Sequence, residues 1–209
     1  MTCDLTPHHL ALTDEWLAGA RRWAWEALDG DGAPRDPWRD HALVAAPYDA
    51  ALRVNPPLRS AADARACLEA LVDGTADAIA TDHAPHAQVD KAVEFGVARP
   101  GIAGIETALG LLLGAVDAGL VPLRRVIEAL TIGPARILGR GGPADERAAI
   151  TGGAVADLVV FDRSAGWTVG AGTLLTRGFG HPLEGRELAG EVLLTVAAGR
   201  LAFEAPAAG

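Results

Sequence analysis

Ala80-Thr81-Asp82-His83-Ala84-Pro85-His86 is the stretch on which the interpretation of this sequence depends. It follows a short, mostly apolar run over residues 76–80, which predicts a buried strand. A carboxylate and two imidazoles therefore follow directly where a strand ends. In α/β barrels, the carboxyl ends of the strands carry the catalytic groups. A strand followed by an ordinary polar turn would produce the same short pattern, so the rest of the chain has to decide between the two.

The segment before this stretch predicts a helix. Ser60 and Asp63 form a capping box, apolar residues follow at helical spacing, and Gly74 stands where a C-terminal cap belongs. A helix followed by a strand is a unit of a parallel α/β sheet. Residues 1–13, in which Pro7 resists helix formation, are expected to form another strand and its extended exit.

The second half of the chain changes character near residue 141. Before that point, apolar spacing predicts three helices, over residues 105–118, from Pro122 to 130, and from Gly133 to Gly139. After it, short strands with turn signals are expected over residues 156–162, 191–196 and 201–203. We therefore divide the chain into an α/β part, residues 1–140, and a small β-rich segment, residues 141–209.

Residues 14–53 hold four of the five tryptophans, between Trp16 and Trp38. The first half of this segment predicts a helix through Leu28, which ends at a glycine- and proline-rich break over residues 30–34. A tryptophan-rich patch is one form of partner surface. We favour the simpler interpretation, a small amphipathic element that packs on the main body.

The composition limits the functional class. The 209 residues are half hydrophobic, enough for a sizeable core, and the net charge of −9 disfavours nucleic-acid binding. Cys3 and Cys67 are far apart and outside any CxxC pair, as expected of a reduced cytoplasmic protein. The first residues do not resemble a signal peptide, and the apolar run over residues 109–121 is too short and broken to span a bilayer.

Five stretches of the chain together form a recognisable series. They are Thr6-Pro7-His8-His9-Leu10, Asn55-Pro56-Pro57-Leu58-Arg59, residues 80–86, residues 101–108 and Ala156-Asp157-Leu158-Val159. In this order they resemble the dihydroorotases of the amidohydrolase superfamily. The resemblance implies the C-terminal part of a zinc-dependent (β/α)8 barrel, about its last two strands and their helices, followed by a small β-rich segment. It also implies the interconversion of dihydroorotate and N-carbamoyl-L-aspartate in pyrimidine biosynthesis.

The resemblance also assigns roles to individual residues. Asp82 would bind zinc and transfer the proton of the attacking water, and His86 would face the carboxylate of the substrate. Asn55 would bind the ring amide, to which it offers both a donor and an acceptor. Pro100 and Gly101 would contact the substrate through their backbone, although phenylalanine usually stands where this chain has Pro100.

Other histidines are given no ligand role by the resemblance. His8 and His9 are expected to be structural or to lie behind the site, and His41 and His181 are expected to be surface or loop residues. The His-x-His pair and the further ligands of the family are not found in this sequence, so Asp82 is the single expected zinc ligand. The chain is therefore expected to start at the seventh of eight strands and to show negligible zinc content and no turnover by itself.

Three functional interpretations follow. The first is a dihydroorotase whose activity needs the other half of the site, supplied by a missing N-terminal half; a homodimer is also considered. The second is another cyclic amidohydrolase, such as an allantoinase or hydantoinase. The third is a non-catalytic dihydroorotase-like partner of a protein such as aspartate carbamoyltransferase. The position of His86 favours an acidic substrate, and the presence of Asp82, His86 and Asn55 argues against long degeneration.

Overall fold

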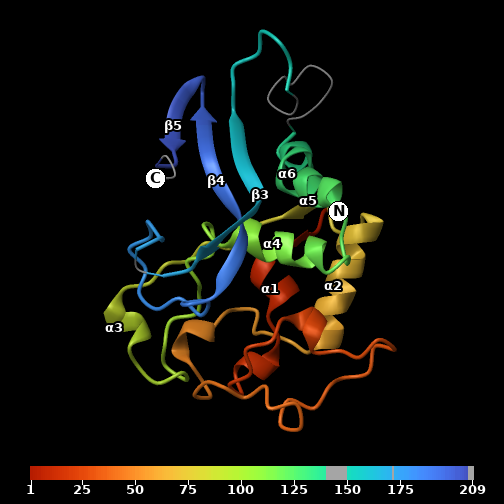
Figure 1. The fold of residues 1–209 in the computed structure, drawn as a ribbon, viewed down its shortest axis with the longest axis vertical. Coiled ribbons are helices and arrows are strands. Elements are labelled where there is room, and N and C mark those ends of the chain that lie inside the picture. The colour runs from red at the N-terminus through yellow and green to blue at the C-terminus, as the bar shows by residue number, and fades with distance from the viewer. Residues whose placement is uncertain (140–149, 171, 207–209) are drawn as a thin grey trace.

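The structure is a computed structural model, and it describes residues 1–139, 150–170 and 172–206 (Figure 1). The expected boundary between residues 140 and 141 lies outside the described residues. The chain is an α/β protein, as the sequence predicts, with a two-stranded parallel sheet and a separate three-stranded antiparallel sheet.

The parallel sheet joins the start of the chain to the stretch that carries the polar cluster. Strand β1 (Asp4–Leu5) pairs with β2 (Ala78–Ile79), with Asp4 opposite Ala78 and Leu5 opposite Ile79. Both residues of β2 are buried. Because parallel strands end at the same edge of their sheet, the residues after Leu5 and after Ile79 come together there.

The segment after β1 is a helix and not the extended segment expected from Pro7. Helix α1 (Pro7–Ala11) begins at Pro7, where a missing N–H group costs nothing, and the Thr6 hydroxyl caps it by accepting a hydrogen bond from the His9 N–H. A threonine followed by a proline favours the start of a helix, and the predicted extended segment did not include this preference. As a result, His8 is carried on a helix and points into the protein.

The long helix predicted over residues 14–28 is also wrong. Two single turns replace it, η1 (Asp14–Trp16) and η2 (Ala24–Glu26), and a third, η3 (Ala50–Leu52), comes just before Asn55. Gly19 interrupts the run with a φ of +102°, and a Cβ there would meet the Ala45 carbonyl oxygen. The backbone of residue 45 thus passes too close for a continuous helix.

Four of the remaining helices agree closely with expectation, whereas the short helix over residues 88–91 was not predicted. Helix α2 (Ala61–Asp73) has the predicted Ser60–Asp63 capping box and the left-handed Gly74 cap. It is followed along the chain by α3 (Gln88–Lys91), α4 (Ala108–Asp117), α5 (Leu123–Leu130) and α6 (Ile132–Ile137). Among the described residues, every helix falls short of the length and apolarity that a bilayer crossing requires.

The predicted strands of the second half form one antiparallel sheet, β3 (Leu158–Thr168), β4 (Glu187–Ala197) and β5 (Arg200–Glu204). The sheet extends away from the helices in Figure 1, and the base of β4 lies against α4. Gly110 of α4 makes this close approach possible, because a Cβ there would lie 2.7 Å from the Leu188 Cβ.

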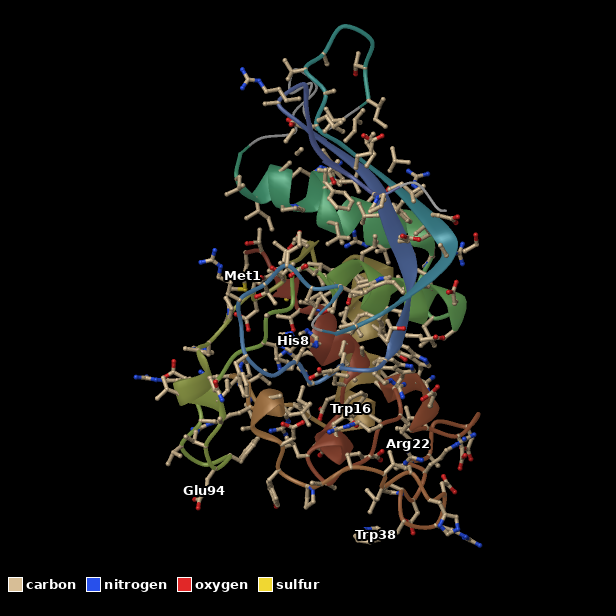
Figure 2. The ribbon with its side chains drawn as sticks, turned by 60° about the vertical axis from the view of Figure 1, so that its left-hand side comes forward. Met1, His8, Trp16, Arg22, Trp38 and Glu94 are labelled. Atoms are coloured by element: carbon tan, nitrogen blue, oxygen red, sulfur yellow. The ribbon has the colours of Figure 1, made fainter. Side chains whose placement is uncertain are left out.

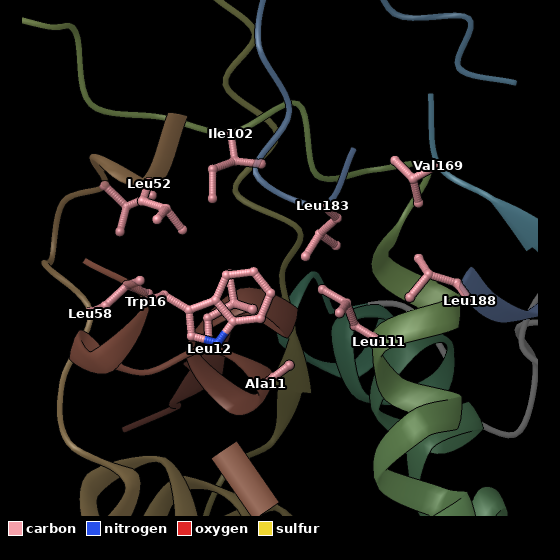
Figure 3. Close-up of a cluster of buried hydrophobic side chains, with 11 residues drawn as sticks. Ala11, Leu12, Trp16, Leu52, Leu58, Ile102, Leu111, Val169, Leu183 and Leu188 are labelled. Carbon is pink, nitrogen blue, oxygen red and sulfur yellow. The ribbon is translucent and has the colours of Figure 1, made fainter. Parts of the chain in front are cut away.

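The main core joins segments that are distant in sequence (Figure 3). Trp16 is fully buried at its centre, and its indole N–H donates to the Arg22 carbonyl. Trp23 and Trp25 pack against this core, whereas Trp38 is exposed (Figure 2). Three of the four tryptophans of residues 14–53 therefore pack on the main body, as the simpler interpretation held. The buried members of the core are Ala11, Leu12, Trp16, Leu52, Val54, Leu58, Ile102, Leu111, Val169, Leu183 and Leu188.

Candidate functional site

Asp82 lies just beyond β2 with an unusual backbone conformation. Its φ is +47°, in the left-handed region that aspartate tolerates better than most residues but that still costs free energy. The carboxylate is largely exposed, and its Oδ2 lies 4.0 Å from Nε2 of His8 on α1. The parallel pairing of β1 with β2 explains this contact, since both residues follow the same edge of the sheet.

His8 is buried, with 4% of its surface exposed, and lies near the centre of the molecule (Figure 2). Burial, reinforced by the neighbouring imidazole of His9, lowers the His8 pKa to about 3. The ring is therefore neutral at physiological pH. Its Nε2 makes no hydrogen bond within the described part of the chain. The expectation that His8 lies behind the site agrees with this position.

His86, Pro100 and Gly101 form a compact group. The His86 Nε2 atom lies 3.0 Å from the Pro100 carbonyl oxygen, to which it donates as the protonated nitrogen. Gly101 has a φ of +147°, and a Cβ there would lie 2.9 Å from that same imidazole nitrogen and 2.6 Å from the Ala84 Cβ. Glycine is thus required for the segment after Pro100 to lie against the segment that carries His86.

Asn55 joins this group through the backbone. The Gly101 N–H donates to the Arg53 carbonyl at 2.8 Å, two residues before Asn55. Asn55 itself is exposed. The structure therefore brings His86, Pro100, Gly101 and the Arg53 backbone, two residues before Asn55, into one hydrogen-bonded region. Asp82 is four residues before His86, and among the described residues no hydrogen bond or ion pair connects its side chain to those four.

His83, the other histidine of residues 80–86, makes structural contacts. The His83 Nδ1 atom accepts a hydrogen bond from the Ile105 N–H at 3.2 Å, and His83 forms a parallel bridge with Ile102. The Ala84 N–H donates to the Ile102 carbonyl. These contacts hold the stretch after β2 against residues 101–105.

His8 and His181 line one small cavity of about 10 Å³, which is room for a single water molecule. His181 had been expected at the surface or in a loop. It does lie in a loop, but its Nε2 atom is buried, and within the described residues that atom has no hydrogen-bond partner. Burial lowers its pKa to about 4, against smaller opposing effects of the Ala103 backbone and Glu106. No sequence signal marked this burial.

The His, Cys, Asp and Glu side chains of the described residues do not form a zinc site. A catalytic zinc ion needs about three protein ligands. Across residues 1–139, 150–170 and 172–206, no three His, Cys, Asp or Glu side chains lie close enough together to hold a metal ion. Asp82 and His8 alone do not fulfil the requirement, so the described residues do not fit a complete zinc site.

Two residues missed by the sequence interpretation help to build the site. The Glu106 carboxylate accepts hydrogen bonds from the N–H groups of Leu175 and Thr176, at 2.7 and 2.9 Å, and so ties the start of α4 to the loop before His181. Lys91 is buried beneath the site loop. Glu106 lies in the stretch 101–108 that carries the resemblance, but that stretch does not reveal its contacts with distant backbone groups, and Lys91 follows no motif.

Comparison with known proteins supports the motif-based interpretation. The dihydroorotase of Anaeromyxobacter dehalogenans (strain 2CP-1) is 45% identical over 204 residues, which cover 98% of this chain and 40% of the relative. The dihydroorotase of Geobacter sp. (strain M21) is 37% identical over 98% of this chain and 40% of the relative. The chain therefore spans about two fifths of the length of the curated relatives it matches.

Solved structures of hydantoinases share the fold. The L-hydantoinase (dihydropyrimidinase) of Arthrobacter aurescens superposes with a TM-score of 0.73 at 24% identity, over 97% of this chain and 39% of that one. At this identity the likeness concerns the fold alone. The sequence model of the amidohydrolase family matches residues 40–202, which is most of the chain. Together with the resemblance of the motifs, this match shows that the chain belongs to the amidohydrolase family.

Proposed function

We propose that this chain provides the substrate-binding and proton-transfer part of a dihydroorotase, which opens dihydroorotate to N-carbamoyl-L-aspartate and closes it again. The observation that carries this proposal is the 45% identity to a protein named dihydroorotase over 98% of the chain. In this proposal, β1 and β2 are the last two strands of a (β/α)8 barrel, and residues 141–209 are its β-rich C-terminal segment.

The proposed chemistry at Asp82 is acid–base catalysis. The carboxylate accepts the proton of a water molecule whose oxygen bonds to the carbonyl carbon of the ring amide. The carbon–nitrogen bond then breaks, and Asp82 returns the proton to the leaving nitrogen. An exposed carboxylate at the end of a strand suits this role, since it faces the side from which a substrate would approach.

Other residues of the chain provide the proposed substrate contacts. Asn55 offers its amide group to the ring amide, and the backbone of Pro100 and Gly101 lines the substrate. His86 binds the substrate carboxylate. Because the Nε2–H of His86 already donates to the Pro100 carbonyl at 3.0 Å, Nδ1 is the nitrogen left for the substrate. Only an imidazolium donates from both nitrogens, so we propose that the protonated ring binds the carboxylate.

In this proposal, Asp82 is also one ligand of a zinc site. Asp82 and His8 do not make up a zinc site, and among the described residues no third ligand lies close enough, so the other ligands would have to come from another part of the protein or from a partner chain. We therefore expect the purified chain to contain well under one zinc ion and to show no ring opening by itself. Stoichiometric zinc together with measurable turnover of the isolated chain would contradict this division of the site.

The activity is tested by a graft. The part of the Anaeromyxobacter dehalogenans dihydroorotase that aligns with this chain is replaced by the chain, and ring opening of dihydroorotate is measured with metal content. We expect turnover in the graft, its loss in Asp82→Asn, and no change in Asp162→Asn, a matched variant in which an exposed carboxylate on β3 is neutralised.

The same graft separates the alternatives. An active graft that hydrolyses hydantoin or allantoin but not dihydroorotate would replace the proposal with another cyclic amidohydrolase. The fold likeness to hydantoinases does not by itself favour that outcome, because the identities are low. A folded, metal-loaded graft without activity on any of these substrates would favour a non-catalytic role, such as a dihydroorotase-like partner of aspartate carbamoyltransferase.

A further inference from the structure

Lys91 stands out among the cationic residues of this protein. It is the one lysine in a sequence with 18 lysines and arginines, and only 5% of its surface is exposed. Fully buried lysines are rare because the ammonium group loses its hydration. Burial accordingly lowers the Lys91 pKa, against a smaller opposing effect of Asp49. A buried cation at this place needs a structural or functional reason.

The ammonium group lies between two segments of the candidate site. Its Nζ donates to the Ala50 carbonyl at 3.0 Å and to the Arg53 carbonyl at 3.4 Å. Ala50 belongs to the turn η3, and Arg53 is the residue after this turn, two residues before Asn55. Lys91 itself ends α3, in the loop that leads to Pro100 and Gly101.

The Arg53 carbonyl is the point where the two segments meet. It accepts from Lys91 Nζ and also from the Gly101 N–H at 2.8 Å. The guanidinium of Arg53 closes the link from the other side, since its Nη1 donates to the Phe95 and Gly96 carbonyls at 3.0 and 2.6 Å. The backbone before Asn55 is thus fixed to the loop before Pro100 through charged donors and backbone carbonyls.

We propose that Lys91 is a positioning residue of the substrate site: through the Arg53 carbonyl it fixes the spacing between Asn55 and the Gly101 backbone. The substrate part of this inference rests on the proposed function, whereas the link itself is a property of the chain. Lysine suits the position because its ammonium is compact and can donate to carbonyls in different directions. The planar guanidinium of an arginine would be too large for the same space between two backbone segments.

The link is tested first in the chain by itself, by amide hydrogen exchange. In Lys91→Met, and in Lys91→Arg as a second variant that keeps the charge, we expect the Gly101 amide to exchange about tenfold faster, because its acceptor is no longer held in place. Arg124→Met removes a cation whose side chain is 89% exposed on α5, and it should leave this exchange unchanged. Unchanged Gly101 exchange in both Lys91 variants, or equal acceleration in the control, overturns the inference.

The effect on substrate is tested in the graft. Lys91→Met should raise the KM for dihydroorotate about tenfold while kcat changes less than about threefold, because the displaced groups bind the substrate and Asp82 is not displaced. Asn55→Ala should then cost less affinity in the Lys91→Met background than in the parent. Additive effects, or a loss confined to kcat, contradict the positioning role. An inactive parent graft would refute the proposed function, and the exchange measurement would still decide on the link.

Discussion

The clearest physical consequence of the structure is that the protein should lose stability between pH 7 and pH 5, through the buried imidazoles of His181 and His8. The Leu183 N–H donates to the His181 Nδ1 atom at 3.1 Å, so the proton of the neutral ring is on Nε2, inside the small cavity shared with His8. A second proton would have to bind at Nδ1 and would break the hydrogen bond from Leu183. Burial and this occupied acceptor both disfavour the imidazolium.

The sign and size of the effect follow from linkage. Burial lowers the His181 pKa from 6.5 to about 4, so the unfolded chain takes up a proton in a pH range where the folded chain does not. The stabilisation is fully present above pH 6.5 and is lost as the pH falls toward 4. Between pH 7 and pH 5 the loss amounts to about 2 kcal/mol for His181, and to about the same for His8, whose pKa is lowered further.

The assay is urea unfolding of the chain at pH 7 and at pH 5. His181→Asn keeps a short side-chain acceptor for the Leu183 N–H but cannot take up a proton, so it should lose about 2 kcal/mol less than the parent over this range. His41→Asn changes an exposed histidine and should behave as the parent does. An equal loss of stability in His181→Asn and in the parent would refute the assignment of a buried, neutral His181.

Four further substitutions test how the fold is held together, each by urea unfolding at pH 7. Ser60→Ala removes the hydroxyl that caps α2 and should cost about 1 kcal/mol, whereas Gly133→Ala places a Cβ against the Asp77 carbonyl oxygen and should cost about 3 kcal/mol. Gly30→Ala, at an open position, should be nearly neutral. Arg125→Met removes hydrogen bonds to two backbone carbonyls before β2 and should cost about 2 kcal/mol.

The sequence predicted those elements whose causes are local. Helix α2 was recognised because its capping box and its glycine cap lie within the helix ends themselves. The strands of the second half were recognised from β-branched runs and turn glycines. Local patterns failed over residues 7–28, where the conformation is set by distant packing. Trp16 is buried against residues as far away as Val169, and no helical period describes that contact.

The candidate site was predicted in the same uneven way. The motif resemblance singled out Asn55, His86 and Gly101. In the structure His86 lies against Pro100 and Gly101, and the Gly101 N–H donates to the Arg53 carbonyl, two residues before Asn55. The resemblance could not show this link, because a backbone acceptor does not depend on the identity of its side chain. The burial of His181 was missed for a similar reason, since most of the cavity around it is lined by residues distant in sequence, such as residues 8, 81 and 102.

Within residues 80–86, the contacts of this chain fix His86 more firmly than they fix Asp82. His86 is fixed through its ring nitrogen, through the absence of a Cβ at Gly101, and through its carbonyl, which accepts from the Phe179 N–H. Among the described residues, the one ion-pair contact of the Asp82 side chain is with a neutral imidazole 4.0 Å away. A carboxylate that is exposed and weakly held remains free to bind a proton or a cation. The part of the motif around His86 is therefore held in place by this chain, and in the proposed function the chemistry at Asp82 depends on groups that would join it there.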